Sequence, residues 1–316
     1  MEINKLISLL SLKTEWLARS QTTMIFTAIL SSISLTIFIF YASRKKWLSS
    51  LPWLSGLIIF SGLFLFSGSY QKTPNIQPIT ENMHSDVNFG PVLKAKTNDE
   101  IRQNLIMLTN KSNSGPMRNY YWNAGDSQIG NLNLDIGTVK YSHDSQGRSS
   151  VAQGKLTYDM YQESKGSRQG IPLNPPFWPR YNPKVAIHYS LGNRTYHGYM
   201  YNRSHSIADS LAGTASYTSK YNFTTGTRPQ NVGADQNGGM RAAEEIAEGY
   251  WQEGKHSTNA YINYQVTPIY NGNETISRGS IVDIKSSDGH INRRVVVIND
   301  AEGYIINYNN GQISKK

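Results

Sequence analysis

The sequence predicts an α+β fold in which a central antiparallel sheet follows an N-terminal transmembrane hairpin. Two apolar blocks without a charged residue lie at residues 22–41 and 51–68. From about Tyr120 onward, short segments alternate apolar and polar side chains, as half-buried strands do. Residues 240–252 instead place apolar side chains at helical spacing. We therefore divide the chain into a membrane segment at 1–69, a linker with a short helix at 70–118, and a folded domain at 119–316.

The first apolar block is long enough to cross a bilayer. Its 20 residues, at about 1.5 Å per helical residue, match the roughly 30 Å of hydrocarbon. The second block is slightly shorter, and the loop between the two carries Arg44, Lys45 and Lys46. We predict two transmembrane helices. Two alternatives stay open: a single signal anchor with a processed or re-entrant second segment, and a cleaved signal peptide, whose apolar part is usually shorter.

Composition narrows the chemistry that the chain can perform. There is no cysteine, which excludes disulfides and thiolate metal sites. No two of the seven histidines form a His-x-x-x-His pair, so we do not expect catalytic zinc. The net charge is +9, of which the first 70 residues contribute +4 (6 basic, 2 acidic) and the rest +5 (25 basic, 20 acidic). This moderate excess suits a polyanionic ligand without requiring one.

The segment between the membrane blocks and the first strand is mostly irregular. Residues 70–96 mix Pro, Asn, Gln and Gly, which is typical of a linker. Asn98 is a candidate N-cap for a helix from Asp99 to Asn110. Residues 132–142 predict a strand with a bend near Gly137, followed by a turn at 142–150.

A loop and a hairpin come next. Residues 171–183 hold five prolines, too many for regular structure, and we expect Phe177 and Trp178 to pin this loop to the domain. Residues 185–189 and 195–201 predict a β-hairpin whose second strand ends just before His205. A short extended piece after Asn222 and a helical turn at Pro229 lead to the helix at 240–252. The remaining apolar segments predict further strands of the central sheet, at 260–266, 281–284, 294–298 and 304–308.

The chemistry-bearing residues lie between the hairpin and this helix. His205 closes the sequence Asn202-Arg203-Ser204-His205, and Asn231 follows 26 positions later in TGTRPQN. A neutral imidazole can take a proton near neutral pH, and an amide oxygen suits a Mg²⁺ ion that keeps most of its waters. Arg203 presents a charged fork to phosphate oxygens. Base, cation and phosphate donors are what phosphodiester hydrolysis requires.

These residues resemble the signature of the DNA/RNA non-specific endonuclease family, the ββα-metal nucleases. The likeness extends over RSHSIADSLAG, GTRPQNVG and QNGGMR and is greatest for the Gram-positive surface branch that includes streptococcal DNA-entry nucleases. The resemblance implies that His205 is the general base and Asn231 the metal ligand. Asn202 and Ser204 stand where the family signature has Asp and Gly.

The same resemblance implies further site residues. An asparagine that opens the second block falls on Asn222, as a substrate-binding residue. An acidic helix residue that holds a metal-bound water falls on Glu244, with Glu245 one position away. Arg228 and Arg241 are candidates for binding backbone phosphates.

The expected activity is Mg²⁺-dependent, sequence-non-specific cleavage of DNA, with RNA as a further candidate substrate and Mn²⁺ as a substitute ion. The alternative is a non-catalytic surface receptor for nucleic acid in DNA uptake. Membrane orientation does not follow from charge, because three basic residues precede the first block and three lie in the loop. A non-specific nuclease facing its own chromosome would be lethal, so we expect the domain after residue 68 to be extracellular. The oligomeric state stays open.

Overall fold

The computed structural model describes residues 87–166, 168 and 170–316. They belong to one compact unit that begins at Asn82 and therefore includes part of the predicted linker. The predicted transmembrane segments at 22–41 and 51–68 lie outside the described residues. Within the described part, no helix is both long enough and apolar enough to cross a bilayer.

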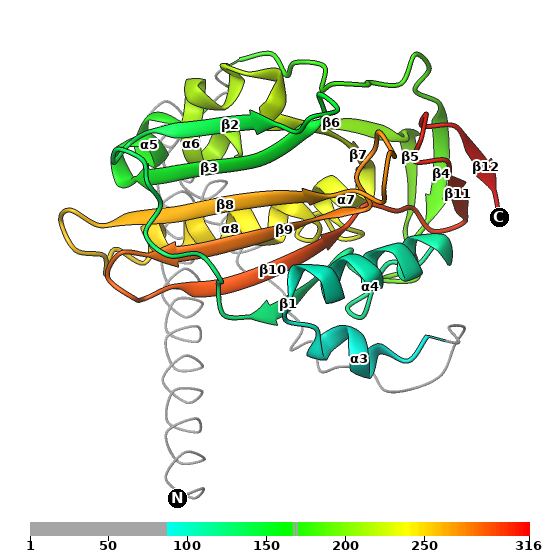
Figure 1. The fold of residues 1–316 in the computed structure, drawn as a ribbon, viewed down its shortest axis with the longest axis horizontal. Coiled ribbons are helices and arrows are strands. Elements are labelled where there is room, and N and C mark those ends of the chain that lie inside the picture. The colour runs from blue at the N-terminus through cyan, green and yellow to red at the C-terminus, as the bar shows by residue number, and fades with distance from the viewer. Residues whose placement is uncertain (1–86, 167, 169) are drawn as a thin grey trace, which may run out of the picture. The chain divides into compact units, whose positions relative to one another are not determined.

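A six-stranded antiparallel sheet forms the centre of the unit (Figure 1). Its strand order is β1-β10-β9-β8-β3-β2. The bounds are Tyr121–Gly125 (β1), Val139–His143 (β2), Ser149–Thr157 (β3), Tyr261–Ile269 (β8), Gly279–Ser286 (β9) and Asn292–Ile298 (β10). The prediction of a central antiparallel sheet is confirmed, including the three strands that the apolar segments at 260–266, 281–284 and 294–298 indicate.

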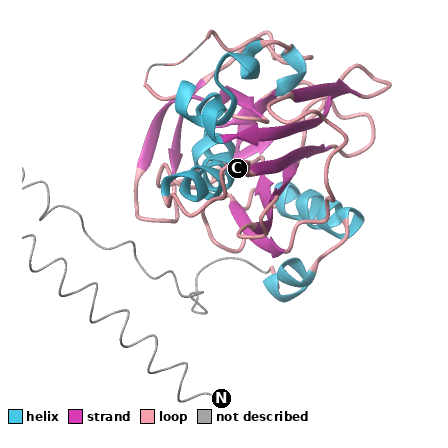
Figure 2. Ribbon diagram, turned by 90° about the vertical axis from the view of Figure 1, so that its left-hand side faces the viewer, coloured by secondary structure: helices cyan, strands magenta, loops and turns pink. Residues whose placement is uncertain are grey.

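Side chains on both faces of this sheet are buried, and the apolar residues of its central strands are divided between two core clusters. In β10, Val296 and Ile298 pack in one core cluster and Val295 and Val297 in the other, because successive strand side chains point to opposite faces. Helix α4 (Asn98–Asn110) packs in the first cluster and α8 (Met240–Gln252) in the second. Figure 2 shows helices against both sides of the strands.

Helix α8 has the bounds that the sequence predicts, whereas α4 begins differently. Thr97, not Asn98, is the N-cap of α4: its hydroxyl accepts from the amide of Glu100, whose carboxylate in turn accepts from the amide of Thr97. This reciprocal pairing satisfies two amides at once. A further short helix, α3 (Phe89–Lys94), occupies part of the segment that composition predicts as linker.

The second strand is shorter than predicted. Gly137, with φ of +81°, lies in a turn, and β2 begins only at Val139. Residues 132–137 are therefore not a strand, because the backbone changes direction where the alternation slips. The turn at 144–148 joins β2 to β3, and α5 (Tyr158–Glu163) follows β3 directly. Neither β3 nor α5 is predicted by the sequence patterns.

Three two-stranded sheets lie outside the central one. They pair β4 (Lys184–His188) with β5 (Thr195–Tyr199), β6 (Tyr201–His205) with β7 (Phe223–Thr227), and β11 (Tyr304–Ile306) with β12 (Ile313–Lys315). The prediction that residues 304–308 belong to the central sheet is therefore wrong: β11 pairs with β12 in a separate C-terminal ribbon. The predicted β4–β5 hairpin is confirmed, yet His205 lies on a third strand, β6.

Short helices connect these strands to the rest of the domain. They are α6 (Asp209–Ala212), the 3₁₀ turns Gly213–Tyr217 and Lys220–Asn222, and α7 (Arg228–Val232). The predicted helical turn at Pro229 is confirmed as α7, which Thr227 caps by accepting from the amide of Gln230. Gly239, with φ of +57°, joins α7 to α8, and a Cβ there would lie 2.2 Å from the carbonyl oxygen of Gln230. Only glycine allows α8 to start this close to α7.

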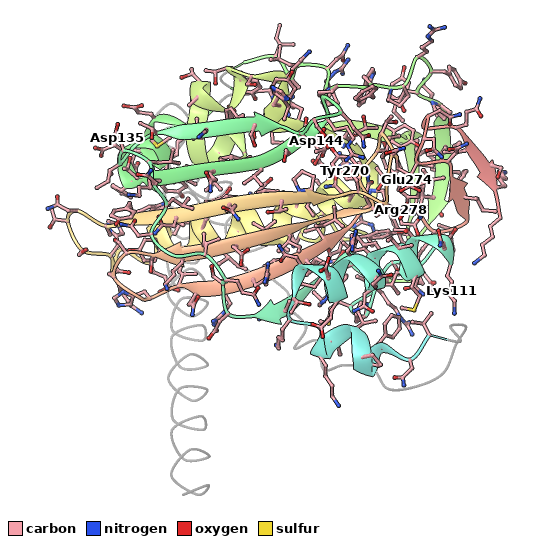
Figure 3. All side chains as sticks on the ribbon, viewed as in Figure 1. Lys111, Asp135, Asp144, Tyr270, Glu274 and Arg278 are labelled. Carbon is pink, nitrogen blue, oxygen red and sulfur yellow. The ribbon has the colours of Figure 1, made fainter. Side chains whose placement is uncertain are left out.

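One buried arginine ties the C-terminal part to α4. Arg278 donates to both carboxylate oxygens of Glu274, at 2.8 and 2.6 Å, and to the side chains of Thr109 and Asn110, at 2.8 and 2.7 Å. Its guanidinium also lies 3.9 Å from the ring centre of Tyr308. Figure 3 shows Glu274 and Arg278 side by side at one end of the sheet. Because every polar group here is paired, we assign this cluster a structural role.

Candidate active site

Strand β6 carries two of the predicted site residues on one side. Arg203 and His205 are two positions apart in the strand, so their side chains point the same way. Both line a cavity of about 560 Å³, together with Arg228 and Asn231 from α7. The short hairpin partner β7 leads directly into α7, which explains how residues 26 positions apart come to one cavity.

The cavity is cationic and aromatic. Three arginines line it, Arg168, Arg203 and Arg228, and its described lining holds no aspartate or glutamate. The remaining lining residues are Pro172, Trp178, Asn182, Tyr196, Tyr199, Tyr201 and Asn202. Arginine forks without a competing carboxylate are suited to binding phosphate oxygens.

His205 lies in an aromatic pocket at the base of the cavity. Its ring centre is 4.4 Å from that of Phe223 and 5.1 Å from that of Tyr217, the latter edge to face. Nε2 is buried and has no hydrogen-bond partner among the described residues. The ring nevertheless lines the cavity, so the imidazole is next to a molecule bound there.

This environment keeps the imidazole neutral. Burial, with a smaller contribution from the positive charge of Arg168, lowers the pKa of His205 to about 4. An unperturbed histidine titrates near 6.5. In the free protein His205 is therefore unprotonated throughout the neutral range and able to accept a proton.

The two predicted arginines of the cavity are held by neighbours. Arg203 donates from Nε to Oδ1 of Asn174 at 2.6 Å, and its guanidinium lies 4.9 Å from the ring centre of Trp178. Arg228 donates to Gln236 at 2.6 Å, and its guanidinium lies 5.5 Å from a tyrosine ring centre. Neither contact involves a carboxylate, so both guanidinium groups keep their full charge for an anionic ligand.

Asn231 is oriented by Ser204, one of the two residues that depart from the family signature. Ser204 is fully buried and donates from its hydroxyl to Oδ1 of Asn231 at 3.0 Å. An amide oxygen has two lone pairs, so Oδ1 keeps one for a cation. The described residues contain no cluster of three or more His, Cys, Asp or Glu that could hold a metal. The donor set thus fits an ion that takes few protein ligands and keeps its waters, as Mg²⁺ does.

Asn222, predicted to bind substrate, is not among the residues that line the cavity. The residue is fully buried, and its Oδ1 accepts from the amide of Ile207 at 2.8 Å. Its Nδ2 donates to the carbonyls of Ile207 and Ser216 at 2.9 and 2.8 Å. These bonds hold the chain that leaves β6 just after His205. Asn222 therefore fixes the backbone next to His205 and does not itself line the cavity.

Arg241, a candidate for binding phosphates, is also not among the residues that line the cavity. Its guanidinium pairs with three carboxylates of α8, those of Glu244 at 3.2 Å, Glu245 at 3.4 Å and Glu248 at 2.5 Å. An arginine shared by three carboxylates has little charge left for a phosphate. The i+3, i+4 and i+7 spacing of these residues is visible in the sequence and could have indicated this network.

Glu244 lies on α8, which packs against α7, but it is not among the residues that line the cavity. Burial raises the pKa of Glu244 to about 7, although Arg241 opposes the shift. Four of the predicted site residues therefore line the cavity: Arg203, His205, Arg228 and Asn231. Glu244 lies on the adjoining helix α8.

Sequence reasoning missed several cavity residues. Arg168 lies outside every recognisable pattern, and Trp178 was expected only to pin the loop. Tyr196, Tyr199 and Tyr201 alternate along β5 and β6, a pattern that indicates sheet packing. Both Phe177 and Trp178 are predicted to pin the loop to the domain. Trp178 does pack against the core, whereas Phe177 is half exposed.

Comparison with known proteins identifies a family. A family model described as DNA/RNA non-specific endonuclease matches residues 127–288. A deoxyribonuclease from Streptococcus dysgalactiae subsp. equisimilis is 32% identical over 195 residues, which are 53% of this chain and 58% of that protein. The matched region therefore spans little more than half the length of this relative.

Solved structures include two similar nucleases. The Sda1 nuclease with a bound zinc ion is 29% identical and has a TM-score of 0.55, over 63% of this chain and 97% of that one. NucA from Streptococcus agalactiae with a bound magnesium ion is 21% identical and has a TM-score of 0.48, over 71% and 99% of the two chains. The likeness to Sda1 shows a shared α+β fold with a central antiparallel sheet.

Proposed function

The chain belongs to the DNA/RNA non-specific endonuclease family, and on that premise we propose that it hydrolyses phosphodiester bonds of DNA with the aid of Mg²⁺. RNA is a further candidate substrate, and Mn²⁺ a candidate substitute ion. One observation carries the proposal: His205, Asn231 and the cavity arginines line one cavity whose described lining has no carboxylate. A base, an oxygen ligand and phosphate donors are thereby brought together.

Each of these residues has a distinct part in the proposed reaction. Arg203 and Arg228 hold the substrate phosphate, which fixes the position of the phosphorus atom relative to His205. The imidazole of His205 accepts the proton of the attacking water, whose oxygen bonds to phosphorus as the leaving oxygen departs. Asn231 would hold the divalent ion, and Ser204 would hold Asn231. Such an ion, when bound, neutralises charge that grows on the phosphate and the leaving oxygen.

Digestion of supercoiled plasmid and of RNA tests this function. The purified protein should cut plasmid in millimolar Mg²⁺ and stop cutting when excess chelator is added. Parallel assays with Mn²⁺ and Zn²⁺ identify the ion that supports cutting, which matters because Sda1 was solved with zinc. Undiminished cutting in excess chelator would contradict a metal-dependent mechanism.

The lowered pKa of His205 predicts an unusual pH profile. The value of kcat/KM reports ionisations of the free enzyme, so loss of activity through protonation of His205 should occur near pH 4. From an unperturbed imidazole we would expect the loss at pH 6 to 7, and the buried site corrects that expectation. The measurement is kcat/KM on a short DNA substrate between pH 3.5 and 8, with metal in excess. A fall in kcat/KM near pH 6.5 that is absent from the profile of His205→Ala would contradict the assignment of His205 as a buried, neutral base.

A receptor that binds nucleic acid without cutting it is the alternative function. It would need the arginines and aromatic rings of the cavity, but it has no need of a neutral imidazole beside the phosphate site. The combination of His205 with Asn231 therefore favours the enzyme. Binding without any cutting, under every metal tested, would favour the receptor.

We further propose that the nuclease domain lies at the outer surface of the cell membrane, held by the apolar blocks at 22–41 and 51–68. This location keeps a non-specific nuclease away from the chromosome. Protease added to intact cells should then remove the domain and leave a short membrane-bound N-terminal fragment. A domain that is fully protected in intact cells, but cut after lysis, would contradict the placement.

A further inference from the structure

Exposed apolar side chains gather on the proline-rich loop at residues 171–183. Among the described residues, nine large apolar side chains are exposed, and four of them belong to these 13 positions. Ile171 is 85% exposed, Tyr181 75%, Phe177 50% and Leu173 39%. A concentration of this kind on one short loop is typical of a binding surface.

The surrounding sequence is basic and has no acidic residue. Between residues 164 and 208 there is no Asp or Glu, although the same stretch contains six Lys and Arg residues. They are Lys165, Arg168, Arg180, Lys184, Arg194 and Arg203. Most protein surfaces mix both signs of charge. Aromatic rings in a positively charged segment without acidic residues are complementary to a ligand that carries both phosphates and flat apolar groups.

A second cavity, of about 750 Å³, lies against this loop. Phe177, Trp178, Arg180 and Tyr181 line one part of it, and residues 309–313 line another. We call it the loop cavity. Trp178 also lines the candidate active site, where it lies beneath Arg203. The two cavities are therefore adjacent across one tryptophan.

Phe177 has a backbone conformation that its side chain disfavours. Its φ is +59°, and the amide of Trp178 donates to the carbonyl of Pro175 at 3.2 Å, which closes a turn with Phe177 at its third position. Turns with positive φ at this position normally have Gly or Asn there. Phenylalanine occupies this position despite the cost, and its side chain is half exposed. Strain of this kind often accompanies function.

We propose that the loop cavity binds an unpaired nucleobase of the substrate strand by stacking on Phe177 and Tyr181. The proposal rests on the function given above, because it places this base next to the phosphate in the active-site cavity. Arg180 lines the same cavity and can bind a neighbouring phosphate. Stacking on aromatic rings tolerates every base, so such a subsite adds affinity without sequence preference. It also requires the strand to be single or locally opened.

Fluorescence anisotropy of a labelled 12-residue oligothymidylate tests the subsite. The full-length protein carries His205→Ala so that the probe is not cut. Since stacking is worth roughly 1–3 kcal/mol per base, Phe177→Ala and Tyr181→Ala should each weaken binding about 5- to 100-fold. Binding of a 12-base-pair duplex should change less than about twofold. Tyr158→Ala, which removes an exposed ring on α5, is the matched control.

A second variant separates binding from folding. Phe177→Gly should unfold at the same or a higher temperature, because glycine adopts φ of +59° without strain. It should nevertheless lose as much affinity for the oligothymidylate as Phe177→Ala. Phe177→Trp should retain binding, since it keeps an aromatic face.

Two outcomes would overturn the subsite. Unchanged oligothymidylate binding by both Ala variants would show that the rings make no contact with the strand. Equal weakening of single-stranded and duplex binding would show a general contact and not stacking on an unpaired base. Because anisotropy does not depend on cutting, these outcomes are independent of the plasmid assay that tests the proposed function.

Discussion

Replacing His205 with Ala is expected to lower the rate of plasmid cleavage by at least about 10²- to 10⁴-fold, the range typical of losing a general base. The arginines and Asn231 remain in the cavity, so binding of DNA should change little. The effect should thus fall on kcat and not on KM. Nicking of supercoiled plasmid at saturating DNA and Mg²⁺ measures it.

His197→Ala is the matched control for this variant. His197 is an exposed histidine on β5 and does not line the active-site cavity. Its replacement should leave the rate within about twofold of the parent. A similar loss in both variants would indicate a general effect on folding, which thermal unfolding of the two proteins would reveal.

Replacing Asn231 with Ala is expected to have the next largest effect. The substitution removes the amide oxygen that would hold the divalent ion, and it leaves the buried hydroxyl of Ser204 without its acceptor. We expect a rate loss of about 10²-fold or more at low Mg²⁺, and a higher Mg²⁺ concentration for half-maximal activity. Titration of the rate with Mg²⁺ measures both effects.

Three further variants make the metal experiment specific. Asn231→Asp keeps an oxygen at the site and should retain more activity than the Ala variant. Glu244→Gln should cost less than Asn231→Ala, because a carboxylate outside the cavity lining would act through a water. Asn237→Ala, an exposed asparagine a few residues after α7, is the control. An Asn231→Ala protein with the metal dependence of the parent would contradict its assignment as the ligand.

Much of the fold follows from local patterns. The strands β8, β9 and β10 contain apolar segments that pack in the two core clusters, and α8 has one buried face between a glycine pair and a polar end. Such regularities depend on neighbours in sequence. The pairing of β6 with β7 does not depend on sequence neighbours. It places Arg203 opposite Thr225, and the segment between them contains α6. No periodicity in the chain indicates that pairing.

Some residues of the site can likewise be recognised in the sequence, and others cannot. His205 and Asn231 are recognisable because their residue types and spacing match a known signature. Asn222 belongs to that signature too, yet its amide is used up by the backbone of Ile207 and Ser216, which only the folded chain reveals. Arg168 reaches the cavity through a loop, so its sequence position gives no indication of its role.

Ser204 illustrates what a departure from the family signature can mean. The family resemblance places glycine here, where no side chain could contact Asn231. The serine is buried and bonds the predicted metal ligand. In the sequence the substitution looks neutral. In the fold it contacts a residue that lines the cavity.

Chemical rescue of His205→Gly is the most direct test of the central claim that an imidazole in this cavity takes the proton from water. Without additive, the variant should cut plasmid at least about 10²-fold more slowly than the parent. Added imidazole can occupy the vacated space between Phe223 and Tyr217. Cutting should then rise with the concentration of neutral imidazole and saturate. A His205→Gly protein that cuts as fast as the parent without imidazole would contradict this role of His205.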